Sequence, residues 1–214
     1  MKSAIEKIKT VIRGIMSEVA KLLDMMTNGF IRPWHVSAVS FFGHVVVLLA
    51  LSEAMFTEAA VLLIGFGLLD ALDGAVARHQ GSASTRGMLL DSTSDRLKEA
   101  LIYAGLAYYF ATITSPLGAL YSALALGLSV SVSYVKAKGE VSLLEQAQAK
   151  DKKIKNINRE FGAGIFSYEV RMFVLVVALL AHQPLYGVLV VAGGSLLTFA
   201  ARFHEVATRL DDKN

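Results

Sequence analysis

The sequence predicts an all-α integral membrane protein with six transmembrane helices, and three observations support this prediction. Of the 214 residues, 54% are hydrophobic, and the mean hydropathy of +0.52 is too high for an ordinary soluble domain of this length. Six stretches are apolar over a length that can cross a bilayer. All 21 lysines and arginines lie outside the connections that join these stretches in pairs. The six predicted spans are residues 34–52, 57–78, 88–112, 116–137, 163–182 and 185–204.

The segment before the first span predicts an amphipathic helix. It has no continuous apolar stretch of the kind that signal peptides contain. Instead, apolar residues recur three and four positions apart, and basic residues accompany them. Such a helix can lie on the cytoplasmic leaflet, or it can pack on the protein itself or on a second copy, and the sequence leaves both open. The apolar series is Ile5, Ile8, Ile12, Ile15, Val19, Leu22 and Met26.

The distribution of charge predicts the orientation in the membrane. The connections around residues 53–57, 112–115 and 181–185 contain no lysine or arginine, so the positive-inside rule places both termini in the cytoplasm. The net charge of +3 suits anionic membrane lipids and phosphorylated substrates, and it gives no indication of a nucleic acid partner. We expect an amphipathic juxtamembrane helix at residues 1–30, one six-helix membrane domain at 31–208 and a short polar tail at 209–214.

Four aspartates lie at the predicted cytoplasmic ends of the second and third spans. An ionised carboxylate inside a bilayer costs about 2.5–3.5 kcal/mol on insertion scales, so such groups mark functional sites. Asp70 and Asp73 are three residues apart and Asp91 and Asp95 are four apart, so each pair shares one face of its helix. Packing these faces together would bring four negative charges to one point, where two divalent cations would neutralise them. The sequence therefore predicts a two-metal carboxylate site at the membrane surface, facing the cytoplasm.

The aspartates belong to a longer pattern, which reads D-x2-D-G-x2-A-R-x8-G-x3-D-x3-D. This pattern resembles the signature of the CDP-alcohol phosphotransferases, and every fixed position is present. The resemblance implies an enzyme of phospholipid biosynthesis that moves a phosphatidyl-type group from a CDP-lipid to a second alcohol and releases CMP. It also implies a homodimer. The fixed positions are Asp70, Asp73, Gly74, Ala77, Arg78, Gly87, Asp91 and Asp95.

The resemblance implies a role for each of these residues. Asp70, Asp73 and Asp91 are expected to be the principal ligands of two Mg²⁺ or Mn²⁺ ions, the cations that hard oxygen ligands and a phosphate substrate favour. Asp95 is expected to be the catalytic base, and its carboxylate is also expected to touch a metal. Small residues leave room for the nucleotide, and the arginine can reach the diphosphate. The expected CDP-lipid site comprises Asp73, Gly74, Ala77, Arg78 and Gly87.

The start of the first span departs from the family pattern. Members often carry a Pro-Asn…Thr element there, where this chain has Pro33, Trp34 and, in the place of the threonine, Ser37. Proline is retained, but tryptophan stands for asparagine and serine for threonine. This departure affects the contacts that the segment would make with the nucleotide.

The basic residues near the other cytoplasmic ends bear on the identity of the acceptor. The run at 133–138 resembles a Ser-Tyr-x-Lys-Ala-Arg element of the phosphatidylinositol phosphate synthase branch, whose acceptor is inositol 1-phosphate and whose donor is CDP-diacylglycerol or CDP-archaeol. One arginine of that branch is replaced here by Tyr168. The alternative is that these basic residues snorkel at helix ends. The residues expected to bind the acceptor phosphate are Lys136, Lys138, Arg171 and Arg202.

Other functions stay open at this point. A pocket of four cations would also suit glycerol 3-phosphate, whereas serine or choline-like acceptors have no phosphate to pair with. Intramembrane carboxylates also line ion pathways, so a divalent cation transporter is a rival from another class. Against transport, the acidic residues all lie at one face, and the other half of the bilayer has no polar relay.

Overall fold

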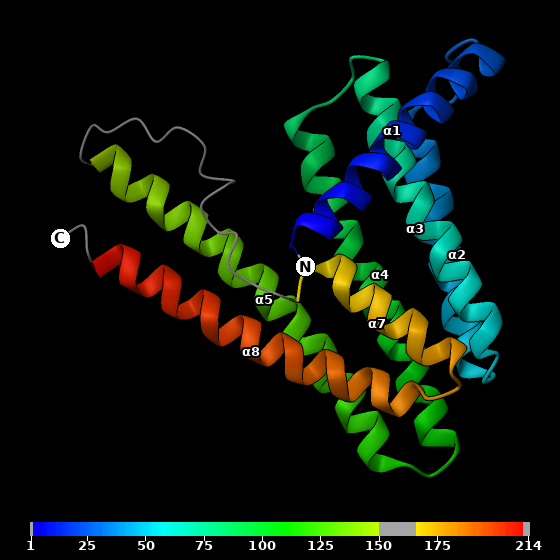
Figure 1. The fold of residues 1–214 in the computed structure, drawn as a ribbon, viewed down its shortest axis with the longest axis vertical. Coiled ribbons are helices and arrows are strands. Elements are labelled where there is room, and N and C mark those ends of the chain that lie inside the picture. Colours follow the sequence, from blue (N-terminus) through cyan, green and yellow to red (C-terminus); the bar gives the residue numbers. More distant parts are fainter. Residues whose placement is uncertain (1, 150–165, 212–214) are drawn as a thin grey trace. The chain divides into compact units, whose positions relative to one another are not determined.

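The computed structural model describes the backbone of residues 2–149 and 166–211 and the side chains of residues 10–146 and 166–210. These residues form seven helices and no strand (Figure 1). The predicted all-α class is therefore confirmed. The helices are α1 (Lys2–Thr27), α2 (Pro33–Ser52), α3 (Phe56–His79), α4 (Thr85–Thr112), α5 (Pro116–Ala149), α7 (Tyr168–Leu180) and α8 (Pro184–Asp211).

Four of these helices are long and apolar enough to cross a membrane, namely α2, α3, α5 and α8. Helix α4 is 28 residues long, but its N-terminal half carries several charged side chains. Helix α7 has 13 residues and is about 20 Å long, shorter than the hydrocarbon core of about 30 Å. The predicted fifth span began at residue 163, and residues 163–165 lie outside the described part of the chain.

Helix α5 continues past residue 137, where the sequence predicted the end of the fourth span. The apolar stretch stops there, but the helix itself runs on to Ala149. Lys136 and Glu140 form an ion pair at 3.8 Å one turn apart, which supports the helix in this polar part. The rest of the predicted connection, residues 150–165, lies outside the described residues.

The chain divides into two compact units, and the first comprises Met1–Gly105. Helices α2 and α3 form an antiparallel pair, because the hydroxyls of Ser37 and Ser40 bond to Asp73 and to the carbonyl of Phe66. Proline in the first turn of α2 suits a helix start, since its missing N–H would have no partner there. This pair places the end of α3 next to the start of α2.

Helix α1 packs across the C-terminal part of α3 (Figure 1). Met16, Ala20 and Leu23, four and three residues apart, contact a small core that includes Leu72 and Val76 of α3. Of the apolar series predicted from the sequence, Ile15, Val19, Leu22 and Met26 are exposed and Ile12 is half-buried, while the side chains of Ile5 and Ile8 lie outside the described residues. The helix therefore packs on the protein with one side and presents a second apolar side, as an interfacial helix does.

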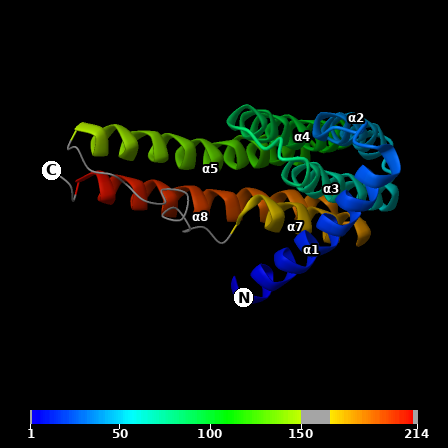
Figure 2. The ribbon, with the colours of Figure 1, turned by 90° about the horizontal axis from the view of Figure 1, so that it is seen from above.

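The second unit, Leu106–Asn214, contains a parallel pair of long helices. Figures 1 and 2 show α5 and α8 side by side. Ser129 lies 3.5 Å from Ser195, and the Gln146 amide donates to the carbonyl of Leu210. The residue numbers of the two contacts differ by 66 and 64, and such a nearly constant difference is what a parallel pair gives. The short helix α7 packs antiparallel on α8, since Phe166 before α7 meets Thr198 and Gly187 meets Ala178.

Gly105 allows α4 to approach α2 closely. A methyl group at this position would lie 2.7 Å from the carbonyl oxygen and 3.1 Å from the Cα of Leu48. We expect Gly105→Ala to lower the stability of the protein by about 1–3 kcal/mol, because the backbone of α2 would have to move. A lower midpoint of thermal unfolding in detergent is the measurement.

The matched control is Gly127→Ala in α5, where nothing lies within 4 Å of the added methyl group. This change should leave the midpoint unchanged or raise it, since alanine favours a helix by about 1 kcal/mol over glycine. Equal midpoints for the two variants would contradict the close approach.

Candidate active site

The motif residues lie on two neighbouring helix ends of the first unit. Asp70 and Asp73 belong to the last turns of α3, and Asp91 and Asp95 to the first turns of α4. A short connection, residues 80–84, joins the two helices. Ser84 caps the start of α4, because its hydroxyl accepts a hydrogen bond of 3.1 Å from the N–H of Gly87. The chain thus reverses direction between the two pairs of carboxylates.

Asp73 is held by a contact between helices. It is 9% exposed, and the Ser37 hydroxyl of α2 donates a hydrogen bond of 2.6 Å to its Oδ2. The same hydroxyl lies 3.1 Å from the carbonyl of Pro33 one turn earlier. Serine in the place of the family's threonine therefore still supplies a hydroxyl, and here that hydroxyl orients a carboxylate of the motif.

Asp70 and Asp95 share a cation that the sequence analysis did not identify. The ammonium of Lys98 donates a hydrogen bond of 2.5 Å to Oδ1 of Asp70 and lies 3.9 Å from Oδ1 of Asp95. Lys98 is 1% exposed, so its charge is removed from water and depends on these carboxylates. In the sequence, Lys98 has the spacing of an ordinary i, i+3 ion-pair partner of Asp95, so the sequence alone does not indicate its role in the site.

The remaining charges form one electrostatic group with this pair. Asp91 interacts electrostatically with Asp70, and Asp95 with Asp91. Arg96 lies 3.6 Å from both Asp95 and the buried Glu99. The four predicted carboxylates of α3 and α4 are therefore close enough to repel one another, and Lys98 interacts with the same group.

The donor chemistry of this group suits a hard divalent cation, since all four side chains offer carboxylate oxygens. Their positions do not form a ready coordination shell. Among the described side chains, no three acidic or histidine groups lie close enough together to hold one metal ion. Lys98 contacts Asp70 of α3 and lies 3.9 Å from Asp95 of α4, so the protein supplies one positive charge itself.

The small residues and the arginine of the motif lie on the last turns of α3. A methyl group at Gly74 would come 3.3 Å from Nη1 of Arg78, so the glycine lets the guanidinium lie along its own helix. Ala77 is half-buried and Arg78 is exposed. The arginine is therefore free to reach a ligand at the end of the helix.

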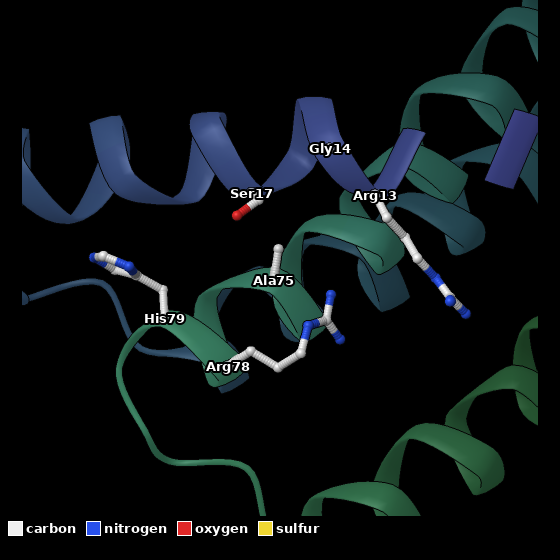
Figure 3. Close-up of a pocket in the computed structure, with 6 residues that line it drawn as sticks. All are labelled: Arg13, Gly14, Ser17, Ala75, Arg78 and His79. Atoms are coloured by element: carbon white, nitrogen blue, oxygen red, sulfur yellow. The ribbon is translucent and has the colours of Figure 1, made fainter. Parts of the chain in front are cut away.

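A cleft of about 430 Å³ lies between α1 and the end of α3 (Figure 3). Gly14 and Ser17 of α1 and Ala75 of α3 line it with small side chains, and the guanidinium groups of Arg13 and Arg78 extend beside it. No ion pair joins either arginine to a carboxylate among the described residues, which suits an anionic ligand.

His79 lines the same cleft, and its ring lies 3.5 Å from the carboxylate of Asp24 on α1. In the sequence, Arg13 is one of the basic residues that accompany the apolar series of the N-terminal helix, and nothing there indicates a ligand site. Its nearness to Arg78 depends on how α1 crosses α3, and the helical pattern alone does not contain that information.

The predicted acceptor residues lie in the second unit. Arg171 is 1% exposed and donates to the carbonyl of Phe166, and Arg202 donates to the carbonyl of Val132. The two guanidinium groups interact electrostatically with each other. The structure thus brings these two predicted residues together.

The two predicted lysines lie on α5, and one of them is linked to the arginines. Lys136 forms its ion pair with Glu140, and Glu140 in turn interacts electrostatically with Arg202. Lys138 is exposed and, two residues on, is turned about 200° around the helix from Lys136. Lys136 is therefore linked to the arginine pair through Glu140. Lys138 lies on the exposed side of α5, as a snorkelling lysine would.

Curated relatives resemble the chain over much of its length. It is 33% identical over 158 residues to the phosphatidylinositol phosphate synthase of Mycolicibacterium smegmatis, which covers 70% of this chain and 65% of the relative. It is 29% identical over 214 residues to the archaetidylinositol phosphate synthase of Pyrococcus horikoshii, which covers 97% of this chain and 98% of the relative.

A solved enzyme shares the fold. Crystal structures of the Mycobacterium tuberculosis phosphatidylinositol phosphate synthase match with a TM-score of 0.74, one with CDP-DAG bound and one in complex with manganese and citrate. The first is 23% identical and covers 91% of this chain and 94% of its own. The corresponding values for the second are 22%, 90% and 89%.

The family model for CDP-alcohol phosphatidyltransferases matches residues 30–200, which include every fixed position of the aspartate motif. That match covers well over half of the chain. The chain therefore belongs to the CDP-alcohol phosphatidyltransferase family and is a membrane transferase of phospholipid synthesis.

Proposed function

We propose that this enzyme transfers a phosphatidyl-type group from CDP-diacylglycerol or CDP-archaeol to the hydroxyl of inositol 1-phosphate and releases CMP. The observation that carries the proposal is the complete aspartate motif, placed on the adjoining ends of α3 and α4 with a guanidinium group beside it. Relatives named for inositol phosphate products support the acceptor. The transferase family also speaks against the transporter hypothesis.

In the proposed reaction, the carboxylate of Asp95 takes the proton of the acceptor hydroxyl. The hydroxyl oxygen bonds to the β-phosphorus of the CDP-lipid, and the bond from that phosphorus to the bridging oxygen breaks, so CMP leaves with the electron pair. Arg78 stabilises the negative charge of the diphosphate with its planar fork of donors. Arg13 adds a second guanidinium on the other side of the cleft.

The remaining carboxylates have a holding role. Asp70, Asp73 and Asp91, with Asp95, would hold two Mg²⁺ or Mn²⁺ ions, whose chemistry is to offset charge on the phosphates and to lower the pKa of the attacking hydroxyl. Ser37 keeps the Asp73 carboxylate in one orientation through its hydrogen bond. Gly74, Ala77 and Gly87 keep the nucleotide side of α3 and α4 free of bulky side chains.

For the acceptor, Arg171 and Arg202 are the proposed contacts of its phosphate, with Lys136 and Lys138 nearby on α5. Two neighbouring guanidinium groups offer charge-assisted donors in a geometry that suits a phosphate. We further propose that all six helices from α2 to α8 cross the membrane, that the termini and the site face the cytoplasm, and that the enzyme is a homodimer.

Asp95→Asn tests the reaction itself. The amide cannot accept the proton of the hydroxyl, so we expect CMP release from CDP-lipid and inositol 1-phosphate to fall by about 10²–10⁴-fold. Radiolabelled CMP release by purified protein with Mg²⁺ measures this, and Mn²⁺ binding should largely survive as a control for folding. Wild-type protein that releases no CMP with any alcohol would refute the proposed function.

A panel of acceptors tests the substrate. Purified enzyme with CDP-lipid should use inositol 1-phosphate at a far higher kcat/KM than glycerol 3-phosphate or serine. Arg202→Leu should raise KM for the phosphorylated acceptor by about 10²-fold, since a charge-assisted contact contributes roughly 1.5–3 kcal/mol. A higher kcat/KM with glycerol 3-phosphate would assign the enzyme to that acceptor instead.

Arg13→Ala tests the participation of α1 in donor binding. Loss of one guanidinium should raise KM for CDP-lipid by about 10-fold and leave KM for the acceptor unchanged. Lys21→Ala is the matched control, because Lys21 also lies on α1 but pairs at the surface with Glu18. Similar effects of both changes would show that the charge of the helix matters and that the cleft does not.

A further inference from the structure

We infer that Lys98 is a tethered cation that holds the carboxylate cluster together in the metal-free protein and gives way when a divalent ion binds. This inference rests on the proposed function, because it concerns the metal that the same carboxylates would hold. It assigns a positioning role to a residue outside the fixed positions of the motif.

The first step is the place of Lys98 in the fold. It lies three residues after Asp95 and seven after Asp91, so it shares their face of α4. Its ammonium bridges to α3 through the bond of 2.5 Å to Asp70. Lys98 therefore joins the two helices at the level where the two pairs of carboxylates meet.

The second step is its burial. Lysine side chains are almost always exposed, and one that is 1% exposed needs charge partners close by. Asp70 and Asp95 are those partners, and Asp73 and Asp91 also interact electrostatically with the ammonium. Every carboxylate of the motif thus acts on this one cation.

The third step is the balance of charge. Four carboxylates match two divalent ions, so a bound pair of ions together with the buried Lys98 would leave one positive charge in excess. The ammonium also hydrogen bonds to Oδ1 of Asp70, one of the two oxygens that this carboxylate could offer to a metal. Lys98 and a second divalent ion therefore exclude each other.

The fourth step is how the lysine can leave. Its charge stands at the end of a flexible four-carbon stem, so the ammonium can move away from Asp70 without a shift of α4. The cluster is then preassembled by Lys98 and released to the metal. The expected cost of this arrangement is a lower affinity for the ion that displaces it.

Lys98→Met keeps the length of the side chain and removes its charge. The measurement is a titration of full-length protein in detergent with Mn²⁺, in which electron paramagnetic resonance reports the free ion. We expect the variant to bind Mn²⁺ about 10-fold more tightly than the wild type, a change of 1.4 kcal/mol in the free energy of binding. Without metal and with chelator, the variant should unfold at a lower temperature than the wild type, and saturating Mn²⁺ should remove the difference. Lys21→Met is the control, since it makes the same charge change at an exposed position of the same unit.

A measurement on the wild type guards against a variant that fails to fold. Lys98 should resist acylation of its amine without metal and become reactive when Mn²⁺ binds, as mass spectrometry of the modified protein would show. Unchanged affinity in Lys98→Met, or a lysine that stays protected while Mn²⁺ is bound, would overturn the inference. Wild-type protein that binds no Mn²⁺ would instead refute the metal site of the proposed function.

Discussion

Mutual repulsion among four carboxylates on the adjoining ends of α3 and α4 is the constraint on which the rest of the first unit depends. Like charges near hydrocarbon raise one another's cost, so each needs a nearby partner. Ser37 of α2 donates to Asp73, and Lys98 of α4 donates to Asp70. The same contacts that offset the repulsion also join α2, α3 and α4. The contacts that pack the first unit therefore also position the carboxylates of its candidate metal site.

The sequence predicted those parts of the site that depend on spacing along a helix. Asp70 and Asp73 at i, i+3 and Asp91 and Asp95 at i, i+4 share faces wherever the chain is helical, and the structure has helices at both places. Lys98 follows the same rule but was not recognised. A lysine three residues from an aspartate is an ordinary surface pattern, and its burial depends on α3, which the spacing within α4 does not describe.

The end of α5 and the two apolar sides of α1 show what the sequence could not predict. Hydropathy predicts where the apolar part of a helix ends. The backbone hydrogen bonds of a helix can continue beyond that point, as they do in α5, which runs past residue 137 to Ala149. For α1, four members of the predicted apolar series are exposed, and a different series, Met16, Ala20 and Leu23, packs on α3. Two apolar sides explain why the sequence could not decide between a lipid-facing and a protein-facing helix. Packing on α3 confirms the protein-facing interpretation for one side, and the lipid-facing interpretation of the exposed side stays a prediction. The packed side brings Arg13 beside Arg78.

The second unit places two positive charges close together, as the first unit does with negative charges. Arg171 is 1% exposed in the interior of the unit and interacts electrostatically with the half-buried Arg202, so two like charges are kept close together. The carbonyls of Phe166 and Val132 accept hydrogen bonds from them, and Glu140 and Glu205 act on Arg202. Apolar side chains of similar volume would pack such an interior at no cost in desolvation. Two guanidinium groups placed close together would suit an anion, and the phosphate of the proposed acceptor is such an anion.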